Sequence, residues 1–168
     1  MDYSRYLVLY SGGADSTYFI EQERTARHLI HYRGYNLYQT SVAITNANLL
    51  NRYLTIVELS SQCQPPDGET NQIHALCDTK IALDACIRAL SFGMDGIVMC
   101  FNSDDIGIDS NAVEAIVTRV ESKFKLLLPL GNRTASEIRE ARKTSKLKSS
   151  SCMNSEHCGY CAKCLKGF

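Results

Sequence analysis

The chain has 168 residues, 45% of them hydrophobic, so it is long enough and apolar enough to bury one substantial core. Its 18 basic residues balance 18 acidic ones, which excludes a general electrostatic attraction to nucleic acid or to membranes. No stretch is long and apolar enough to span a bilayer, and the N-terminus lacks the order of a signal peptide. We therefore expect a cytoplasmic protein with no membrane partner.

Short apolar runs alternate with amphipathic stretches along the chain, and this alternation predicts strands and helices in turn. We expect strands over residues 6–10, 28–32, 54–59, 96–100 and 125–128. We expect helices from about residue 16 and over residues 37–51, 73–92, 112–124 and 134–143, the second with only loosely helical spacing. The alternation predicts an α/β fold, in which helices cover both faces of a parallel sheet of about five strands.

The first chemical motif, Ser11-Gly12-Gly13-Ala14-Asp15-Ser16-Thr17, lies between the first expected strand and the first expected helix. Ligands bind at the carboxyl ends of parallel strands, and glycines let the backbone approach an anion closely. The N-terminal amides of a helix add partial positive charge, and the hydroxyls of the motif add donors. The motif therefore predicts a pyrophosphate site, although a glycine turn that merely leads into a helix cap is the simpler alternative.

Asp15 complicates a phosphate site, because its carboxylate repels an anion unless a cation lies between them. Carboxylate oxygens are ligands that Mg²⁺ prefers, so we expect Mg²⁺ to bridge Asp15 and the phosphates. The pattern Gly-x-x-x-x-Gly-Lys-Ser/Thr is absent, as is Gly-x-Gly-x-x-Gly. The loop is therefore neither a P-loop nor a dinucleotide fingerprint.

The pattern Ser-Gly-Gly-x-Asp-Ser at residues 11–16 resembles the signature of the PP-loop ATP pyrophosphatases, which share an adenine nucleotide alpha hydrolase-like fold. The resemblance implies that residues 10–17 bind ATP, with Tyr10, Ser11, Gly12, Gly13, Asp15, Ser16 and Thr17 as its contacts. It implies that pyrophosphate leaves when a substrate oxygen takes AMP, with Ser11 and Asp15 as catalytic residues. Arg133 follows the fifth expected strand and either offers a cation to the phosphates or is a solvated residue at a helix start.

The second chemical motif places four of the eight cysteines within the last 17 residues, as Cys152-x5-Cys158-x2-Cys161-x2-Cys164. Four thiolates suit a tetrahedral Zn²⁺ and leave no open position for catalysis. An iron–sulfur cluster and disulfides are the alternatives. We expect a structural Zn²⁺ that pins residues 151–168, as a zinc knuckle, onto an ATP-binding domain of residues 1–150.

Together, the two motifs resemble the 7-cyano-7-deazaguanine synthases, which act in queuosine biosynthesis, through residues 11–17 and through Ser151-Cys152 with Cys158-Gly159-Tyr160-Cys161-Ala162-Lys163-Cys164. The resemblance implies a ligase that adenylates 7-carboxy-7-deazaguanine, with ammonia as the second substrate and a homodimer as a possible assembly. It places Asp109 at a base-recognising position, whereas residues 76–79 and 102–110 depart from the motifs of those enzymes.

Three alternatives remain open at the level of the sequence. The first is a tRNA-modifying or thiolating enzyme of the same superfamily, in which the six basic residues between positions 133 and 148 contact RNA. The second is a relative that couples a deazaguanine to a macromolecule. The third is a non-catalytic nucleotide-binding subunit.

Overall fold

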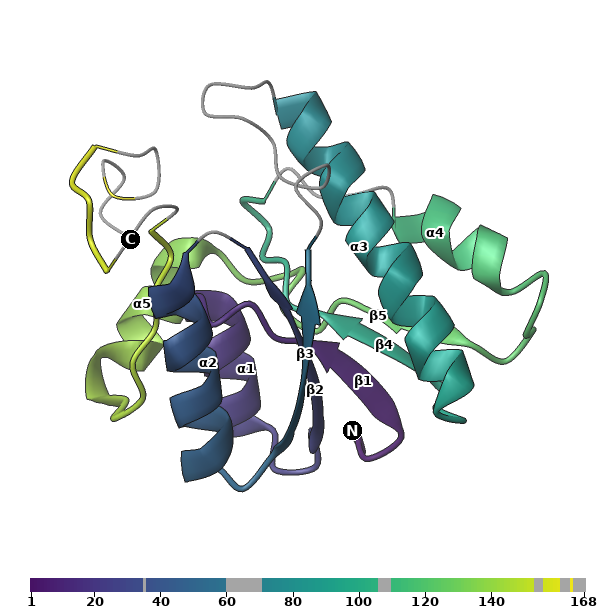
Figure 1. Ribbon diagram of the computed structural model, residues 1–168, viewed down its shortest axis with the longest axis horizontal. Helices are drawn as coiled ribbons and strands as arrows, with labels where there is room; N and C mark the ends of the chain where they lie inside the picture. The colour runs from purple at the N-terminus through teal and green to yellow at the C-terminus, as the bar shows by residue number, and fades with distance from the viewer. Residues whose placement is uncertain (35, 60–70, 106–109, 153–155, 161–163, 165–168) are drawn as a thin grey trace.

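A parallel five-stranded sheet forms the centre of the computed structural model, which describes residues 1–34, 36–59, 71–105, 110–152, 156–160 and 164 (Figure 1). The strands are β1 (Tyr6–Leu9), β2 (His28–Arg33), β3 (Tyr53–Glu58), β4 (Gly96–Met99) and β5 (Lys125–Leu127). The helices are α1 (Ala14–Gln22), α2 (Leu37–Leu49), α3 (Asn71–Ser91), α4 (Ser110–Val117) and α5 (Ala135–Ala141), and a short 3₁₀ helix spans Arg142–Thr144. The spatial order is β3-β2-β1-β4-β5 and every strand pair is parallel, which confirms the predicted α/β fold.

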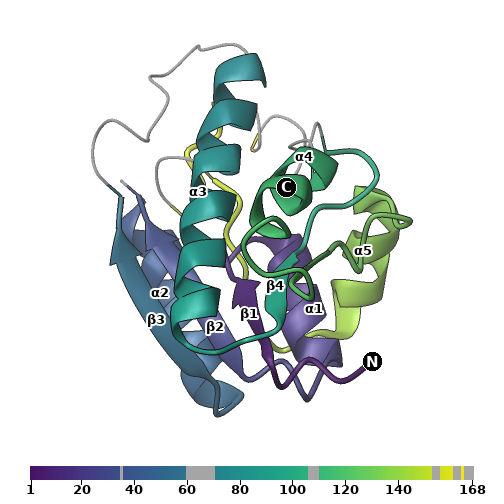
Figure 2. The ribbon, with the colours of Figure 1, turned by 90° about the vertical axis from the view of Figure 1, so that its right-hand side faces the viewer.

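Helices cover both faces of this sheet, as Figures 1 and 2 show: α1, α2 and α5 lie on one face, and α3 and α4 on the other. Neighbouring residues of a strand point to opposite faces. Leu7 therefore packs in the core beneath α3 and α4, and Val8 in the core beneath α1, α2 and α5. In β4, Ile97 likewise packs beneath α3 and α4, and Val98 beneath α1, α2 and α5. Because both faces are buried, the central strands appear in the sequence as unbroken apolar runs.

The predicted helix over residues 112–124 is wrong in its second half, because α4 ends at Val117. The amides of Val120 and Glu121 both donate to the carbonyl of Val117, which closes the helix in tight turns. These turns bring Phe124 into the core, where its exposed fraction is 2%, just before β5 begins. A capping box begins α5, since Thr134 Oγ1 accepts from the Glu137 amide and Glu137 accepts from the Thr134 amide.

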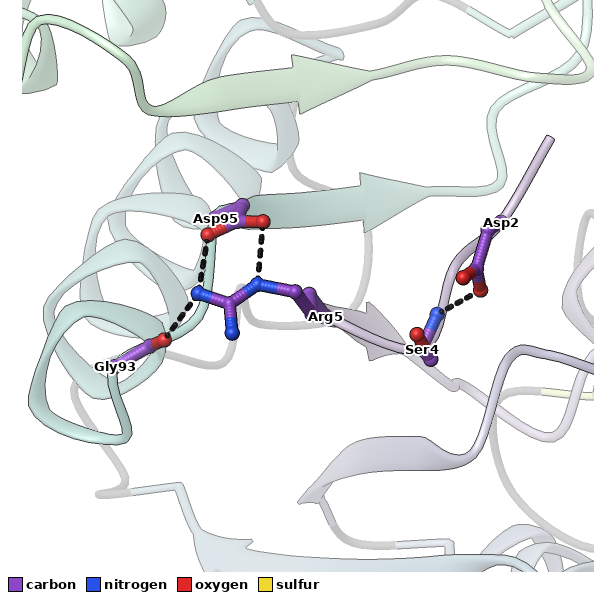
Figure 3. Close-up of polar contacts among 5 residues, drawn as sticks. All are labelled: Asp2, Ser4, Arg5, Gly93 and Asp95. Carbon is purple, nitrogen blue, oxygen red and sulfur yellow. Dashed lines mark hydrogen bonds and ion pairs between the residues drawn. The ribbon is translucent and has the colours of Figure 1, made fainter.

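The amino-terminal ends of β1 and β4 are joined by an ion pair between Arg5 and Asp95 (Figure 3). The Arg5 guanidinium donates to both oxygens of Asp95, at 2.6 and 2.7 Å, and to the carbonyl of Gly93 at 3.3 Å. These hydrogen bonds from Arg5 lower the pKa of Asp95. The ion pair therefore connects the ends of the two central strands that lie opposite to their carboxyl ends.

The segment of residues 148–152, which follows the 3₁₀ helix, runs along the polar side of α2, and we call it the tail segment. Three amide side chains of α2 or its N-cap donate to backbone carbonyls of this segment: Asn46 to Lys148 at 2.7 Å, Gln39 to Ser150 at 3.0 Å and Asn36 to Cys152 at 2.7 Å. Because these polar residues occupy one side of α2, its apolar residues follow helical spacing only loosely. Among the described residues, we find no helix long and apolar enough to cross a membrane.

Candidate functional site

A cavity of about 310 Å³ opens at the carboxyl ends of β1 and β4. These two strands are neighbours although β2 and β3 come between them in the chain, so the cavity lies where the strand order reverses. Open α/β sheets bind their ligands at this position, and the volume suits a small molecule. The lining includes most of the predicted phosphate loop, the strand ends and the tail segment, through Leu9, Tyr10, Ser11, Gly13, Ala14, Asp15, Ser16, Met99 and Ser151.

Gly12 gives the loop a backbone conformation that other residues rarely adopt. Its φ is +81°, and a Cβ atom at this position would lie 2.9 Å from the backbone oxygen of Gln39. The turn can therefore pack against α2 only with glycine at position 12. This close approach directs the chain from β1 into α1, so that the first turn of α1 borders the cavity.

The hydroxyl groups of the loop hydrogen-bond to one another. Ser11 Oγ accepts from the Gly13 amide at 3.1 Å and lies 3.0 Å from Ser16 Oγ. The Gly13 amide is therefore occupied within the loop. The first amides of an α-helix point out of its N-terminus, and this end of α1, with Asp15, borders the cavity. The helix N-terminus is thus the part of the loop best placed to bind an anion.

Tyr10 and Thr17, two further predicted contacts of the nucleotide, lie beneath the loop. Their hydroxyls share a hydrogen bond of 3.2 Å, and Asn46 donates to the Tyr10 hydroxyl at 2.8 Å. Burial raises the pKa of Tyr10. Thr17 is completely buried, so in this structure its side chain supports the loop from below.

His31 is a buried residue of the site that the sequence did not single out. Its Nδ1 lies 2.9 Å from the carbonyl oxygen of Tyr10, and its Nε2 lies 2.9 Å from Thr40 Oγ1. A carbonyl only accepts, so Nδ1 carries the proton and Nε2 accepts from the Thr40 hydroxyl. Burial lowers the pKa of His31, so the neutral ring holds the chain at the point where β1 passes into the loop. A single histidine in a strand carries no sequence pattern that would reveal this role.

Three carboxylates border the cavity: Asp15, Asp78 of α3, and Asp105 of the loop after β4. Cys100, which also lines the cavity, has a raised pKa because of burial and the nearby charge of Asp15. The predicted substrate residue Asp109 lies outside the described residues. The structure does not bring Arg133 to the cavity lining; its guanidinium lies 5.5 Å from the centre of the Tyr18 ring.

Three of the four predicted metal ligands come together at the carboxyl end of the chain. The sulfur atoms of Cys152, Cys158 and Cys164 all lie within 4.8 Å of one another, and those of Cys158 and Cys164 are 3.9 Å apart. The Cys158 amide also donates to the Cys152 sulfur. The described cysteines form no disulfide, and the fourth predicted ligand, Cys161, lies outside the described residues. A group of three buried or half-buried thiols is able to bind a metal ion.

The cysteine cluster is connected to the loop through the tail segment. The Ser150 amide donates to the carbonyl of Gly12 at 2.9 Å, and Ser151 lines the cavity directly before Cys152. The tail segment thus connects the loop to the three thiols at the carboxyl ends of the strands.

Neither a scan against protein-family models nor a search among curated proteins finds a match. Two solved structures are similar in fold. A predicted subunit of a tRNA methyltransferase from Methanocaldococcus jannaschii is 15% identical with a TM-score of 0.53, over 81% of this chain and 72% of that one. The U34-tRNA thiolase NcsA from Methanococcus maripaludis, solved with its [4Fe-4S] cluster, is 15% identical with a TM-score of 0.58, over 87% of this chain and 57% of that one. The chain therefore spans little more than half of the thiolase, and the likeness supports the predicted α/β fold.

Proposed function

We propose that the protein is an ATP-using enzyme that cleaves ATP between the α- and β-phosphates and transfers AMP to a tRNA during base modification. The observation that carries the ATP half is the cavity at the switch point of the sheet, bordered by the N-terminus of α1 and by Asp15. The tRNA half is supported by the fold shared with a tRNA thiolase and with a predicted tRNA methyltransferase subunit. It is also supported by the basic segment between residues 133 and 148.

Different residues of the cavity would bind different parts of ATP. Apolar side chains at the strand ends, Leu9, Ile30 and Met99, offer a wall for a flat purine ring. The first amides of α1 stabilise the negative charge that develops on the departing pyrophosphate. Asp15 would hold Mg²⁺, which neutralises phosphate charge when it is bound. The catalytic effect is positioning and electrostatic stabilisation, and no covalent nucleophile is needed.

Zn²⁺ is the metal that best fits the described thiols. Four thiolates at about 2.3 Å around one tetrahedral ion lie about 3.8 Å apart. The Cys158 and Cys164 sulfurs, at 3.9 Å, agree with this spacing. In a [4Fe-4S] cluster each thiolate binds a different iron, which sets the sulfur atoms farther apart. Zn²⁺ at these cysteines, with Cys161 as the proposed fourth ligand, would hold the tail segment against the loop.

A second candidate function is adenylation of 7-carboxy-7-deazaguanine, followed by amide and nitrile formation with ammonia. The observation in its favour is that the two motifs shared with the 7-cyano-7-deazaguanine synthases are connected in space, since Ser151 lines the cavity and precedes Cys152. The same adenylating site would also suit the alternative in which this protein couples a deazaguanine to a macromolecule. ATP binding without turnover would instead indicate a nucleotide-binding subunit.

The decisive experiment offers the full chain ATP and Mg²⁺ with either a tRNA transcript or 7-carboxy-7-deazaguanine plus ammonia. Release of AMP and pyrophosphate is measured, and the products are analysed by mass. We expect tRNA-dependent AMP formation, and we expect Asp15→Asn to lower its rate at least about 100-fold while the fold is retained. Asp2→Asn, an exposed change at the N-terminus, is the control. AMP formation by Asp15→Asn at the wild-type rate would remove the proposed role of this carboxylate.

A further inference from the structure

A second cavity, of about 360 Å³, adjoins the first, because the two share lining residues. It is lined by the N-terminus of α1, the end of α5, the 3₁₀ helix and the tail segment, through Ala14, Arg139, Arg142, Lys143, Ser149, Ser150, Ser151 and Glu156. Ala14 and Ser151 also line the first cavity, so these two residues form a wall between them. Three of the lining residues are cationic and one is anionic, and the carboxylate of Glu156 already accepts from the Tyr38 hydroxyl at 2.8 Å.

The half-buried guanidinium of Arg142 forms no direct ion pair with a carboxylate among the described residues, although the charges of Glu21 and Asp15 act on it from farther away. Its two terminal nitrogens donate to neutral groups, the Ser149 hydroxyl and the Leu147 carbonyl. Its Nε is buried and has no hydrogen-bond partner in the described part of the chain. Burial lowers the pKa of Arg142, which reflects the loss of hydration around the charge. A partly desolvated charge of this kind is stabilised further by an anion that enters the cavity.

Ser150 provides a second and independent sign of a missing partner. Only 2% of this residue is exposed, and its hydroxyl has no hydrogen-bond partner among the described residues. Its backbone, by contrast, is fully engaged, because the amide donates to Gly12 and the carbonyl accepts from Gln39. Buried hydroxyls are normally hydrogen-bonded. Ser150 and Arg142 thus both line one cavity, and each has a buried polar atom with unmet capacity to donate a hydrogen bond.

We propose that this second cavity binds a backbone phosphate of an RNA substrate through Arg142 and Ser150, next to the nucleotide cavity. The inference rests on the proposed tRNA function and adds a binding site to it. Lys143, which lines the cavity and pairs with Glu140, is exposed, and so are the nearby Lys146 and Lys148. Several exposed cations close together in the chain suit the repeating phosphates of a polynucleotide, whereas a small anion needs only the cavity itself. Because the total charge of the chain is zero, these cations form a local basic region and do not reflect a generally basic protein.

The test measures binding of a labelled tRNA transcript by fluorescence anisotropy at several salt concentrations, in parallel with binding of ATP and of inorganic pyrophosphate. We expect Arg142→Gln to weaken tRNA binding about tenfold and to reduce the slope of log affinity against log salt by about one. Binding of ATP should remain unchanged. Arg119→Gln, an exposed arginine beyond α4 on the opposite face of the sheet, is the matched control and should bind tRNA as the wild type does.

Arg142 also anchors the chain before the tail segment, so its replacement could affect folding. Ser150→Ala serves as the second variant, because the hydroxyl it removes makes no hydrogen bond in the described chain, and it should weaken tRNA binding several-fold without changing thermal stability. Wild-type tRNA affinity in both variants would overturn the inference while leaving the proposed function intact. Loss of pyrophosphate binding with unchanged tRNA binding would assign the cavity to the nucleotide and would also overturn it. A wild-type protein that binds no tRNA would remove the proposed function itself, and the RNA-phosphate site with it.

Discussion

Single residues set the shape of the loop, and Gly12 is the clearest case. The pattern of the sequence identified this glycine as part of a phosphate loop, but the close approach of the Gln39 carbonyl is visible only in the folded chain. Another glycine, Gly93, also has a positive φ of +67°, but a Cβ atom added there would meet no atom of the described residues within 4 Å. A comparison of Gly12 with Gly93 therefore distinguishes the strain of a positive φ from a clash of the added Cβ atom.

We expect Gly12→Ala to lower the free energy of unfolding by more than Gly93→Ala does. Each variant suffers the strain of a positive φ, about 1 to 2 kcal/mol, and only Gly12→Ala adds a clash with α2. Gly12→Ala should also lose ATP binding, because the first turn of α1 is displaced. Urea unfolding and a nucleotide-binding titration measure both effects, and equal losses of stability in the two variants would contradict the clash.

His31 predicts a pH dependence of stability. Its pKa in the folded chain lies below the value of about 6.5 expected for an unfolded chain, because the buried ring is held neutral. Between these two values the unfolded chain binds the additional proton, so the free energy of unfolding falls as the pH drops below about 6.5. In His31→Asn this part of the pH dependence should disappear, although the variant is less stable at neutral pH. Urea titrations between about pH 5 and 8 measure it, and an unchanged slope in the variant would rule out the buried neutral ring as its source.

At the scale of elements, the strands were predictable and α2 was only partly so. The central strands are buried on both faces, so their apolar runs identify them directly. In α2, Asn46 is 1% exposed and bonds both to Tyr10 and to the tail segment. A prediction based on the spacing of apolar residues assigns a polar residue such as Asn46 to the exposed side of the helix. The partners that satisfy it come from positions 36 and 102 residues away, which no local pattern contains.

We expect Asn46→Ala to destabilise the protein by about 2 to 3 kcal/mol. The change leaves the Tyr10 hydroxyl and the Lys148 carbonyl without their buried donor. Asn48→Ala, an exposed change on the same helix, is the control and should alter stability by less than about 0.5 kcal/mol. Chemical unfolding measures both variants, and similar values for the two would mean that the tail segment does not depend on α2.

At the scale of the whole molecule, the fold followed from the order of elements, and a cavity lies where the first motif predicted a site. What could not be predicted was the way in which distant parts meet. The cysteine motif indicated a metal site from its spacing alone, but its connection to the loop depends on the tail segment and on its hydrogen bonds to Gly12 and α2. The distance of Arg133 from the cavity lining likewise depends on how the chain after β5 turns toward Tyr18.

Removal of the metal tests this connection. We expect Cys158→Ser, or treatment of the wild type with a chelator, to lower the zinc content and to reduce the Tm by about 5 °C or more. ATP binding should weaken as well, because Ser151 in the cavity wall is followed by Cys152, a proposed metal ligand. Cys77→Ser, which changes a thiol of α3 outside the cluster, is the control. Elemental analysis and thermal unfolding give the result, and full zinc content in Cys158→Ser would exclude this cysteine as a ligand.

The wall that Ala14 and Ser151 form between the two cavities has a thermodynamic consequence. A ligand that shifts this wall from one side changes the affinity on the other, and such coupling is reciprocal. If RNA tightens the binding of nucleotide by some factor, nucleotide tightens the binding of RNA by the same factor. A protein built in this way would cleave ATP chiefly when the acceptor of AMP is already in place.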